Sequence, residues 1–411
     1  MLRLSVSYTI FLGLVVVLFM SAFNQKNART PFAQNGVKNL PAPPGMAYIP
    51  SGTILYKTGT DTLSEGKNVS LSAFFIDKTE VSNKQYRQFV NWVADSIAVT
   101  NYLKDDSYFK TVKEGSGATA VTRKLIDWDK VKKSSPFDIP SVQDKLAPMF
   151  VMRGDRKMLN PEVLKYRFTY LRAGGSNNNE YVTDTVSVMP AEGIWSKDFP
   201  NAQMAMMDEN YFYHSSFDNH PVVGVTWKQA RAYTDWRGKE FSASLKKNSY
   251  LKDFIFTFSL PTEAQWQYAA EGKTDPEDAN KNKVAANFKQ GEGLYSKDGA
   301  TFTLPVKSYS ANAFGIYNMA GNVSEWTLDA YSPSAIEFVN DLNPVLLYDA
   351  TENDGEVRRR KVVRGGSWKD PGLLLNSSTR NYENQDMPHS YIGFRCVMSA
   401  IEIPSSKIKA K

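Results

Sequence analysis

One stretch of the sequence decides the fold: Asn312-Ala-Phe-Gly-Ile-Tyr-Asn-Met-Ala-Gly-Asn-Val-Ser-Glu-Trp326. Its apolar and aromatic side chains supply buried area on irregular backbone, so the stretch indicates core rather than a mobile loop. Gly315 and Gly321 mark positions where a side chain would clash or where φ must be positive. Asn322 and Glu325 lie among these apolar residues, and burying them without hydrogen-bond partners would be costly.

This stretch is similar to the signature of formylglycine-generating-enzyme (sulfatase-modifying factor) domains, and other pieces of the chain recur in that family's order. They lie at residues 45–52, 75–83, 220–227, 260–270, 363–368 and 392–397. So many ordered matches make a specific signal, whereas any one of them alone would be weak. The resemblance implies an α+β, formylglycine-generating-enzyme-like fold related to C-type lectins. Such a fold has little regular secondary structure, two core helices, short twisted strands and, in this chain, a long insertion.

The chain is long enough, at 411 residues, to bury a sizeable core, and its 42% hydrophobic content is typical of a globular protein. The formal charge of +6 comes from 49 basic and 43 acidic residues, which is a mild excess on a mixed surface. Since no basic run is interleaved with aromatic residues, nucleic acid is not an expected partner.

Residues 1–23 are predicted to be a signal peptide or a signal anchor, with Arg3 before an apolar run at residues 10–20. The run is short for a spanning helix, although residues 8–23 could serve as an uncleaved anchor. A Pro-rich linker is expected at 24–44, the domain at 45–400 and a tail at 401–411. The predicted location is the periplasm, against the inner or outer membrane of a Gram-negative bacterium. With one cysteine, Cys396, the chain has no internal disulfide, and a buried structural thiol is expected.

Two core helices are predicted from their caps and from apolar residues at helical spacing. Ser82 is the expected N-cap of the first helix and Thr226 that of the second, while Thr262 caps a shorter helix. Residues 254–260 are expected to form a strand that leads into this shorter helix.

An insertion at about 95–217 departs from the pattern of the enzymes. Its motifs, at residues 159–164, 194–200 and 210–214, followed by residues 220–227, are similar to the gliding-motility and type IX secretion K/J proteins. Those proteins are envelope components of Bacteroidota that carry such a domain. The resemblance implies other envelope secretion and motility proteins as partners, in a large oligomeric assembly, and membrane association through the N-terminal segment.

The enzymes of the family oxidise a substrate cysteine with copper held by two thiolates, ligands that suit Cu(I). The resemblance places those cysteines in the interval 369–392, which contains none in this chain. Because a fold carries no function without its site, we expect no copper, no catalytic residues and no enzyme activity. The chain is therefore predicted to be a non-catalytic structural component of a secretion and gliding-motility machine.

Two alternatives stay open. One is a metal-dependent oxidase of the same fold, for which His214, Asp218 and His220 would form a facial triad. Against it, these histidines are interpreted as hydrogen-bonding groups in loops that flank a core strand, since no i,i+4 helical pair exists. The other alternative is a lectin-like ligand-binding module, because the fold tolerates loop variation.

The resemblance also implies structural calcium, held by a carboxylate and main-chain carbonyls as hard oxygen sites require. One predicted ligand set is Gly321, Val323 and Glu325. A looser second set is Asn287, Phe288, Asp298 and Ala300. The alternative for Glu325 is a buried carboxylate hydrogen-bonded to loop amides. Glu263 and Glu325 lie inside apolar motifs that serve the scaffold, so they are not expected to act as an acid/base pair.

Overall fold

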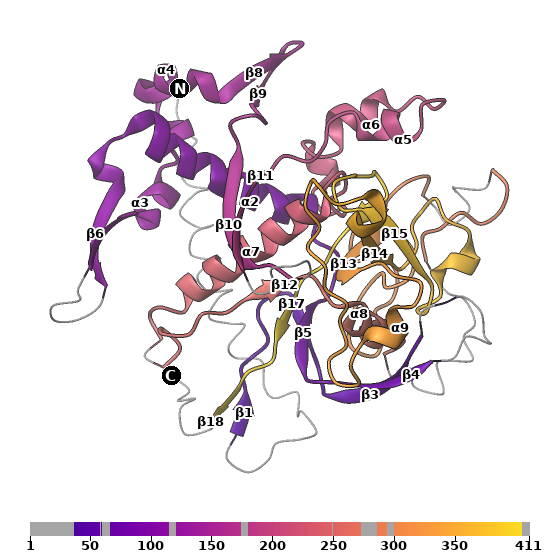
Figure 1. Ribbon diagram of the computed structural model, residues 1–411. Coiled ribbons are helices and arrows are strands. Elements are labelled where there is room, and N and C mark those ends of the chain that lie inside the picture. The colour runs from indigo at the N-terminus through magenta and orange to yellow at the C-terminus, as the bar shows by residue number, and fades with distance from the viewer. Residues whose placement is uncertain are drawn as a thin grey trace.

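The computed structural model describes residues 37–57, 59, 66–114, 121–173, 180–248, 250–272, 286–293 and 300–404. Two four-stranded sheets organise the core (Figure 1). The first has the order β12-β17-β5-β2, with β2 at Met46–Ile49, β5 at Phe74–Asp77, β12 at Phe258–Ser259 and β17 at Val397–Ser399. The second has the order β15-β14-β13-β16, with β13 at Ser324–Ala330, β14 at Arg360–Arg364, β15 at Arg380–Asn384 and β16 at Ile392–Gly393. Only the β13–β16 pair among these is parallel.

The described residues also form five two-stranded antiparallel pairs. They are β1 (Val37–Asn39) with β18 (Glu402–Pro404), β3 (Gly52–Tyr56) with β4 (Lys67–Leu71), β6 (Phe109–Glu114) with β7 (Val121–Ile126), β8 (Phe150–Arg153) with β9 (Arg156–Leu159), and β10 (Lys165–Leu171) with β11 (Tyr181–Ser187). The last three pairs all belong to the insertion, which therefore has strands of its own.

The longer helices begin where the sequence predicts. They are α2 (Asn83–Ile97), α7 (Trp227–Ser244) and α8 (Glu263–Glu271). Ser82, Thr226 and Thr262 each accept a hydrogen bond from the third helical residue, whose glutamine side chain bonds back to the cap, so all three N-terminal predictions are confirmed. Shorter helices are α3 (Trp128–Lys133), α4 (Gln143–Leu146), α5 (Ile194–Asp198), α6 (Ala205–Asn210) and α9 (Ala335–Phe338). Helix α2 runs on into a π-helical turn at Ala98–Leu103, and 3-10 turns lie at Asp106–Tyr108, Pro136–Asp138, Pro140–Val142, Ala147–Met149, Ser215–Phe217, Glu356–Arg359 and Gly372–Leu375.

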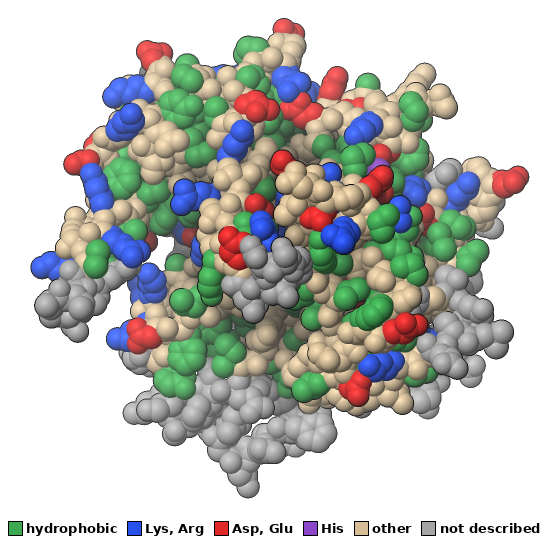
Figure 2. All heavy atoms as spheres, in the orientation of Figure 1, with side chains coloured by type: hydrophobic (Ala, Val, Ile, Leu, Met, Phe, Trp, Pro, Cys, Tyr) green, Lys and Arg blue, Asp and Glu red, His purple; other side chains and the backbone are tan. Residues whose placement is uncertain are grey.

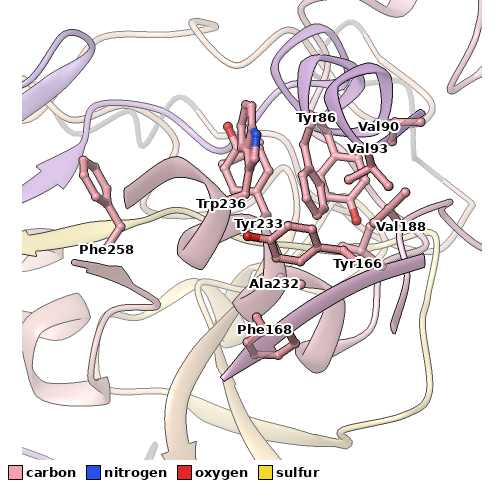
Figure 3. Packing of buried hydrophobic residues seen from close by; sticks show 14 of the residues in the cluster. Tyr86, Val90, Val93, Tyr166, Phe168, Val188, Ala232, Tyr233, Trp236 and Phe258 are labelled. Atoms are coloured by element: carbon pink, nitrogen blue, oxygen red, sulfur yellow. The ribbon is translucent and has the colours of Figure 1, made fainter. Parts of the chain in front are cut away.

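The main core forms between α2 and α7 and includes the insertion. Tyr86 of α2 stacks on Tyr233 of α7 with ring centroids 5.6 Å apart. Tyr166 of strand β10 meets Phe89 of α2 edge to face at 5.2 Å, and Figure 3 shows Tyr166 and Phe168 beside these helices. Since the insertion supplies buried side chains to this cluster, it is packed into the domain rather than attached to its surface.

The stretch at 312–326 has the structure that its glycines predict. Both Gly315 and Gly321 have positive φ, at 77° and 80°. A Cβ at Gly321 would lie 2.4 Å from the backbone oxygen of Asn287. This position therefore requires glycine both for its positive φ and for the close approach of the neighbouring backbone. The backbone stays irregular until β13, and Trp326 is fully buried.

The predicted strand at 254–260 is shorter than expected. Only Phe258–Ser259 pairs with β17, and the residues before it leave the sheet. An apolar run satisfies a strand pattern whether or not a partner strand lies beside it, and here Phe254 and Ile255 face solvent.

Candidate functional site

The segment 369–392, which connects β14 to β16 by way of β15, begins at a turn that only glycines fit. Gly365 and Gly366 have φ of 96° and 69°, in the left-handed region. Beyond them Ser367 donates to the Asp370 carboxylate from its backbone N–H and from its hydroxyl, at 2.9 and 2.7 Å. The start of the segment is therefore held in one conformation.

Buried ion pairs link strands β14 and β15 of this region to helix α8. Glu263, at the start of α8, pairs with Arg364 at 2.9 Å, and Arg380 donates to both of its carboxylate oxygens at 2.8 and 2.7 Å. The Tyr56 hydroxyl donates to the same carboxylate at 2.8 Å. The two arginines come from β14 and β15, so Glu263 ties both strands to α8. With its oxygens engaged in this way, Glu263 is a structural group, as the sequence analysis expects.

A histidine between two carboxylates holds the far end of the segment. His389 bonds Asp198 through Nδ1 at 2.8 Å and Glu383 through Nε2 at 3.0 Å. Burial opposes the charged form, but the hydrogen bonds to Asp198 and Glu383 outweigh it and raise the pKa of His389 to about 9. At neutral pH the ring is an imidazolium whose two N–H groups are both engaged, so it positions the segment and is not a free base.

The insertion supplies one wall of this site. Asp198, at the end of α5, also accepts hydrogen bonds from Ser390 through its backbone N–H at 2.6 Å and its hydroxyl at 2.8 Å. Three residues earlier, Trp195 stacks on Trp368 with ring centroids 5.9 Å apart. The helix α5 is therefore bound to both ends of the segment, to Trp368 at one and to residues 389–390 at the other.

The accessible edge of the site carries an amine and a phenol. The Lys369 Nζ lies 3.0 Å from the Asp370 carboxylate and 4.0 Å from the centroid of the Tyr391 ring. Tyr391 stacks on His389 at 4.7 Å. The Lys369 side chain is 29% exposed, so it is in contact with solvent.

The sequence analysis did not find this group. The motif at residues 194–200 of the insertion includes Asp198, but nothing in the sequence singles out His389. The two side chains are 191 residues apart, and no local pattern could join them.

The residues predicted to bind calcium are only partly brought together. Asn287 and Gly321 meet, since the N–H of Asn322 donates to the Asn287 oxygen at 2.8 Å. Glu325 instead receives Arg395 at 2.7 and 2.6 Å and the indole N–H of Trp266 at 2.8 Å. The Glu325 carboxylate is thus buried and hydrogen-bonded, as the alternative interpretation states. Its donors, however, are the side chains of Arg395 and Trp266 and not the loop amides that the alternative expected. Of the other predicted calcium ligands, Val323 is buried in an apolar cluster. Phe288 and Ala300 are among the described residues, and Asp298 lies outside the described residues.

The alternative histidine triad does not form. His214 accepts from the Ser216 N–H at 3.2 Å, His220 bonds Thr303 at 3.1 Å, and Asp218 pairs with Arg87. Across the described ranges, no three His, Cys, Asp or Glu side chains are grouped so that they could hold a metal ion. These histidines therefore organise loops, as the competing interpretation states.

A copper centre of two thiolates does not fit this chain. Its single cysteine, Cys396, lies after β16, outside the 369–392 segment, and is fully buried. Burial raises the pKa of this thiol well above its usual range, so the neutral form is favoured. The sequence contains no second cysteine.

The fold and the position of this site define a class of protein. The chain belongs to the sulfatase-modifying factor enzyme 1-like domain family, whose model matches residues 32–400. Two solved structures resemble it, PvdO from Pseudomonas aeruginosa (TM-score 0.46, 16% identity, covering 89% of this chain and all of that one) and CarF (TM-score 0.40, 16% identity, covering 86% and 97%).

Among curated proteins, the formylglycine-generating enzyme of Streptomyces coelicolor is 31% identical over 195 residues, covering 44% of this chain and 54% of that enzyme. That of Bos taurus is 25% identical over 381 residues, covering 87% and 75%. The serine/threonine-protein kinase pkn1 of Chlamydia caviae is 30% identical over 232 residues, covering 55% and 30%. The chain thus spans less than a third of that kinase and about half of the Streptomyces enzyme.

These relatives correct the sequence analysis on one central point. The predictions of a non-catalytic structural component and of a chain that is not an enzyme are wrong, because several relatives are named formylglycine-generating enzymes. The missing cysteine pair carried too much weight in that argument: it excludes one ligand set, whereas the relatives favour the oxidase alternative.

Within the part of the chain that the structure describes, no helix is both long and apolar enough to cross a membrane.

Proposed function

We propose that the chain is an oxidase-type enzyme of this family that oxidises a thiol-containing peptide, with dioxygen as the electron acceptor and without a copper–dithiolate centre. The observation that carries the proposal is that buried ion pairs and hydrogen bonds hold segment 369–392 in one conformation. Buried charges hold this segment, with Glu263 paired to Arg380 in its middle and His389 bonded to Asp198 and Glu383 near its end, and it lies where the resemblance places the site of the enzymes. Rigid, buried polar groups that hold an accessible one are typical of functional sites.

Lys369 is the residue that we assign to substrate contact. Its ammonium lies at the accessible edge of the segment, between the Asp370 carboxylate and the face of Tyr391. A positive charge in this position favours an anionic substrate group, such as a peptide carboxylate or a thiolate, over a neutral one. Tyr391 and the Trp195–Trp368 stack hold the surface beside it, which limits how a bound peptide can turn.

The proposal is tested by incubating the full chain with a cysteine-containing peptide, with added copper, with added iron and with no added metal. Mass spectrometry detects the oxidised product, and elemental analysis of the purified protein identifies any resident metal. We expect product in at least one condition, and no dependence on copper. Failure to form product under all three conditions contradicts the proposal, as does product that requires stoichiometric copper.

Within the family, we propose that the chain belongs to the branch that resembles the gliding-motility and type IX secretion K/J proteins and that it is exported to the periplasm. The order of motifs in the insertion supports the first statement, and the apolar run at residues 10–20 supports the second. Fractionation of source cells tests the location. The chain is expected with the envelope, and its recovery in the cytosol alone would overturn this placement.

A further inference from the structure

The loop between α7 and β12 exposes apolar side chains at its tip. Ile255 is 84% exposed, the largest fraction of any large apolar side chain among the described residues, and its neighbour Phe254 is 37% exposed. A single exposed apolar residue needs no explanation, but two in succession on one tip mark a contact surface. We call residues 246–248 and 250–256 the α7–β12 loop.

The tip is held by its own contacts. The Asn248 side-chain oxygen accepts from the backbone N–H groups of Tyr250 and Leu251 at 3.0 and 3.1 Å. Phe254 packs between Tyr250, at 5.6 Å, and the buried Phe256, at 6.2 Å. The loop therefore presents Ile255 on an ordered aromatic base.

Three lysines precede this apolar tip within the same loop. Lys246, Lys247 and Lys252 are exposed, and Asp253 is the acidic residue of the loop, so the loop carries a net positive charge. In Figure 2 a hydrophobic patch lies at the lower left of the molecule, near the place where Figure 1 shows the end of α7. Basic residues in the same loop as an exposed apolar tip match the interface of an anionic bilayer.

The strand topology places the loop at the end of the first sheet from which the chain continues to β18, the partner of β1. Strand β12 is antiparallel to β17, so the residues before β12 leave the sheet at the same end as the residues after β17. Those residues continue into β18, which pairs with β1, the first strand of the described chain. The apolar run at residues 10–20 precedes β1 in the sequence.

We propose that the α7–β12 loop docks on the surface of an anionic phospholipid bilayer, with Ile255 and Phe254 entering the headgroup region and the three lysines contacting lipid phosphates. This contact is independent of the N-terminal segment and of the proposed enzyme activity. This contact would turn one face of the domain toward the membrane. The domain would then have a fixed orientation relative to the bilayer.

The test uses the full chain with an environment-sensitive NBD label at Ile255→Cys. Cys396 is fully buried, so the introduced thiol is the accessible one. The matched control is the same label at Leu373→Cys, where the native side chain is 71% exposed. With vesicles of phosphatidylcholine containing phosphatidylglycerol, NBD emission at position 255 should rise about twofold or more, and it should rise little with phosphatidylcholine alone. Emission at position 373 should not change.

A second variant separates the loop from the N-terminal segment. Replacing Lys246, Lys247 and Lys252 by Gln in the Ile255→Cys chain should remove most of the rise, and the same replacements at the exposed Lys113, Lys133 and Lys197 should not. An equal response at positions 255 and 373, or none at position 255, overturns the proposal. A rise with protein concentration in the absence of vesicles overturns it as well, because a second copy of the chain would then cover the loop.

Discussion

At the scale of single residues, His389 carries a largely buried positive charge that the folded structure stabilises. Since the pKa of His389 is raised from 6.5 to about 9, the folded protein holds this proton more tightly than the unfolded chain. Its contribution to stability is therefore complete below about pH 6.5 and disappears as the pH rises through about 9.

The first prediction concerns this pH dependence. A shift of this size corresponds to on the order of 3 kcal/mol at neutral pH. His389→Gln should therefore be destabilised near pH 6 and approach the parent chain near pH 10, as measured by urea unfolding across that range. Burial likewise raises the pKa of Glu80 to about 8, but Glu80 is present in both chains and its effect on the difference cancels. A difference that is constant with pH contradicts the assignment of charge to His389.

The second prediction concerns Glu263, the buried partner of two arginines. Removing its charge leaves Arg364 and Arg380 buried and uncompensated, so Glu263→Gln should destabilise the fold by about 3–5 kcal/mol. The exposed Glu162 offers a matched control, Glu162→Gln, with an expected change within about 0.5 kcal/mol. Equal unfolding midpoints for the two variants would show that the cluster does not hold the sheet to α8.

At the scale of elements, the third prediction uses two glycines of the stretch at 312–326. Both have positive φ, but a Cβ meets nothing within 4 Å at Gly315 and lies 2.4 Å from the Asn287 oxygen at Gly321. Gly315→Ala should thus lose about 1 kcal/mol from backbone strain alone, and Gly321→Ala at least about 2 kcal/mol more. Similar melting temperatures for both variants would contradict the close approach of the two chain segments.

The sequence predicted the elements whose signals are local. Caps at Ser82, Thr226 and Thr262 and the spacing of apolar residues after them located the helices, because capping and periodicity are properties of neighbouring residues. The strand at 254–260 was predicted too long because an apolar run contains no information about its partner. The Asp198–His389 contact could not be predicted at all, since it joins the insertion to the last strands only after both have folded.

At the scale of the whole molecule, the insertion and the family core form one packed unit around the segment 369–392. Asp198 and Trp195, both from the insertion, contact the segment at its two ends. Because both contacts come from the insertion, the insertion forms part of the candidate site.

The fourth prediction concerns calcium, which remains an expectation from the resemblance. Asn287 and Gly321 lie together, and main-chain carbonyls there are ligands of the kind that calcium prefers. Calcium should therefore raise the melting temperature and a chelator should lower it in a calorimetric scan. An unchanged scan in both conditions would remove the predicted metal.

The most direct test of the proposed function compares product formation from a cysteine-containing peptide by the parent chain, by Lys369→Met and by the control Lys113→Met. Because Lys369 is assigned to substrate contact and Lys113 lies on the β6–β7 pair, we expect Lys369→Met to lose about tenfold in kcat/KM. Lys113→Met should retain the parent value, and both variants should keep the parent melting temperature. Equal rates for all three chains would contradict the assignment of Lys369, and the absence of product from the parent chain would contradict the enzyme itself.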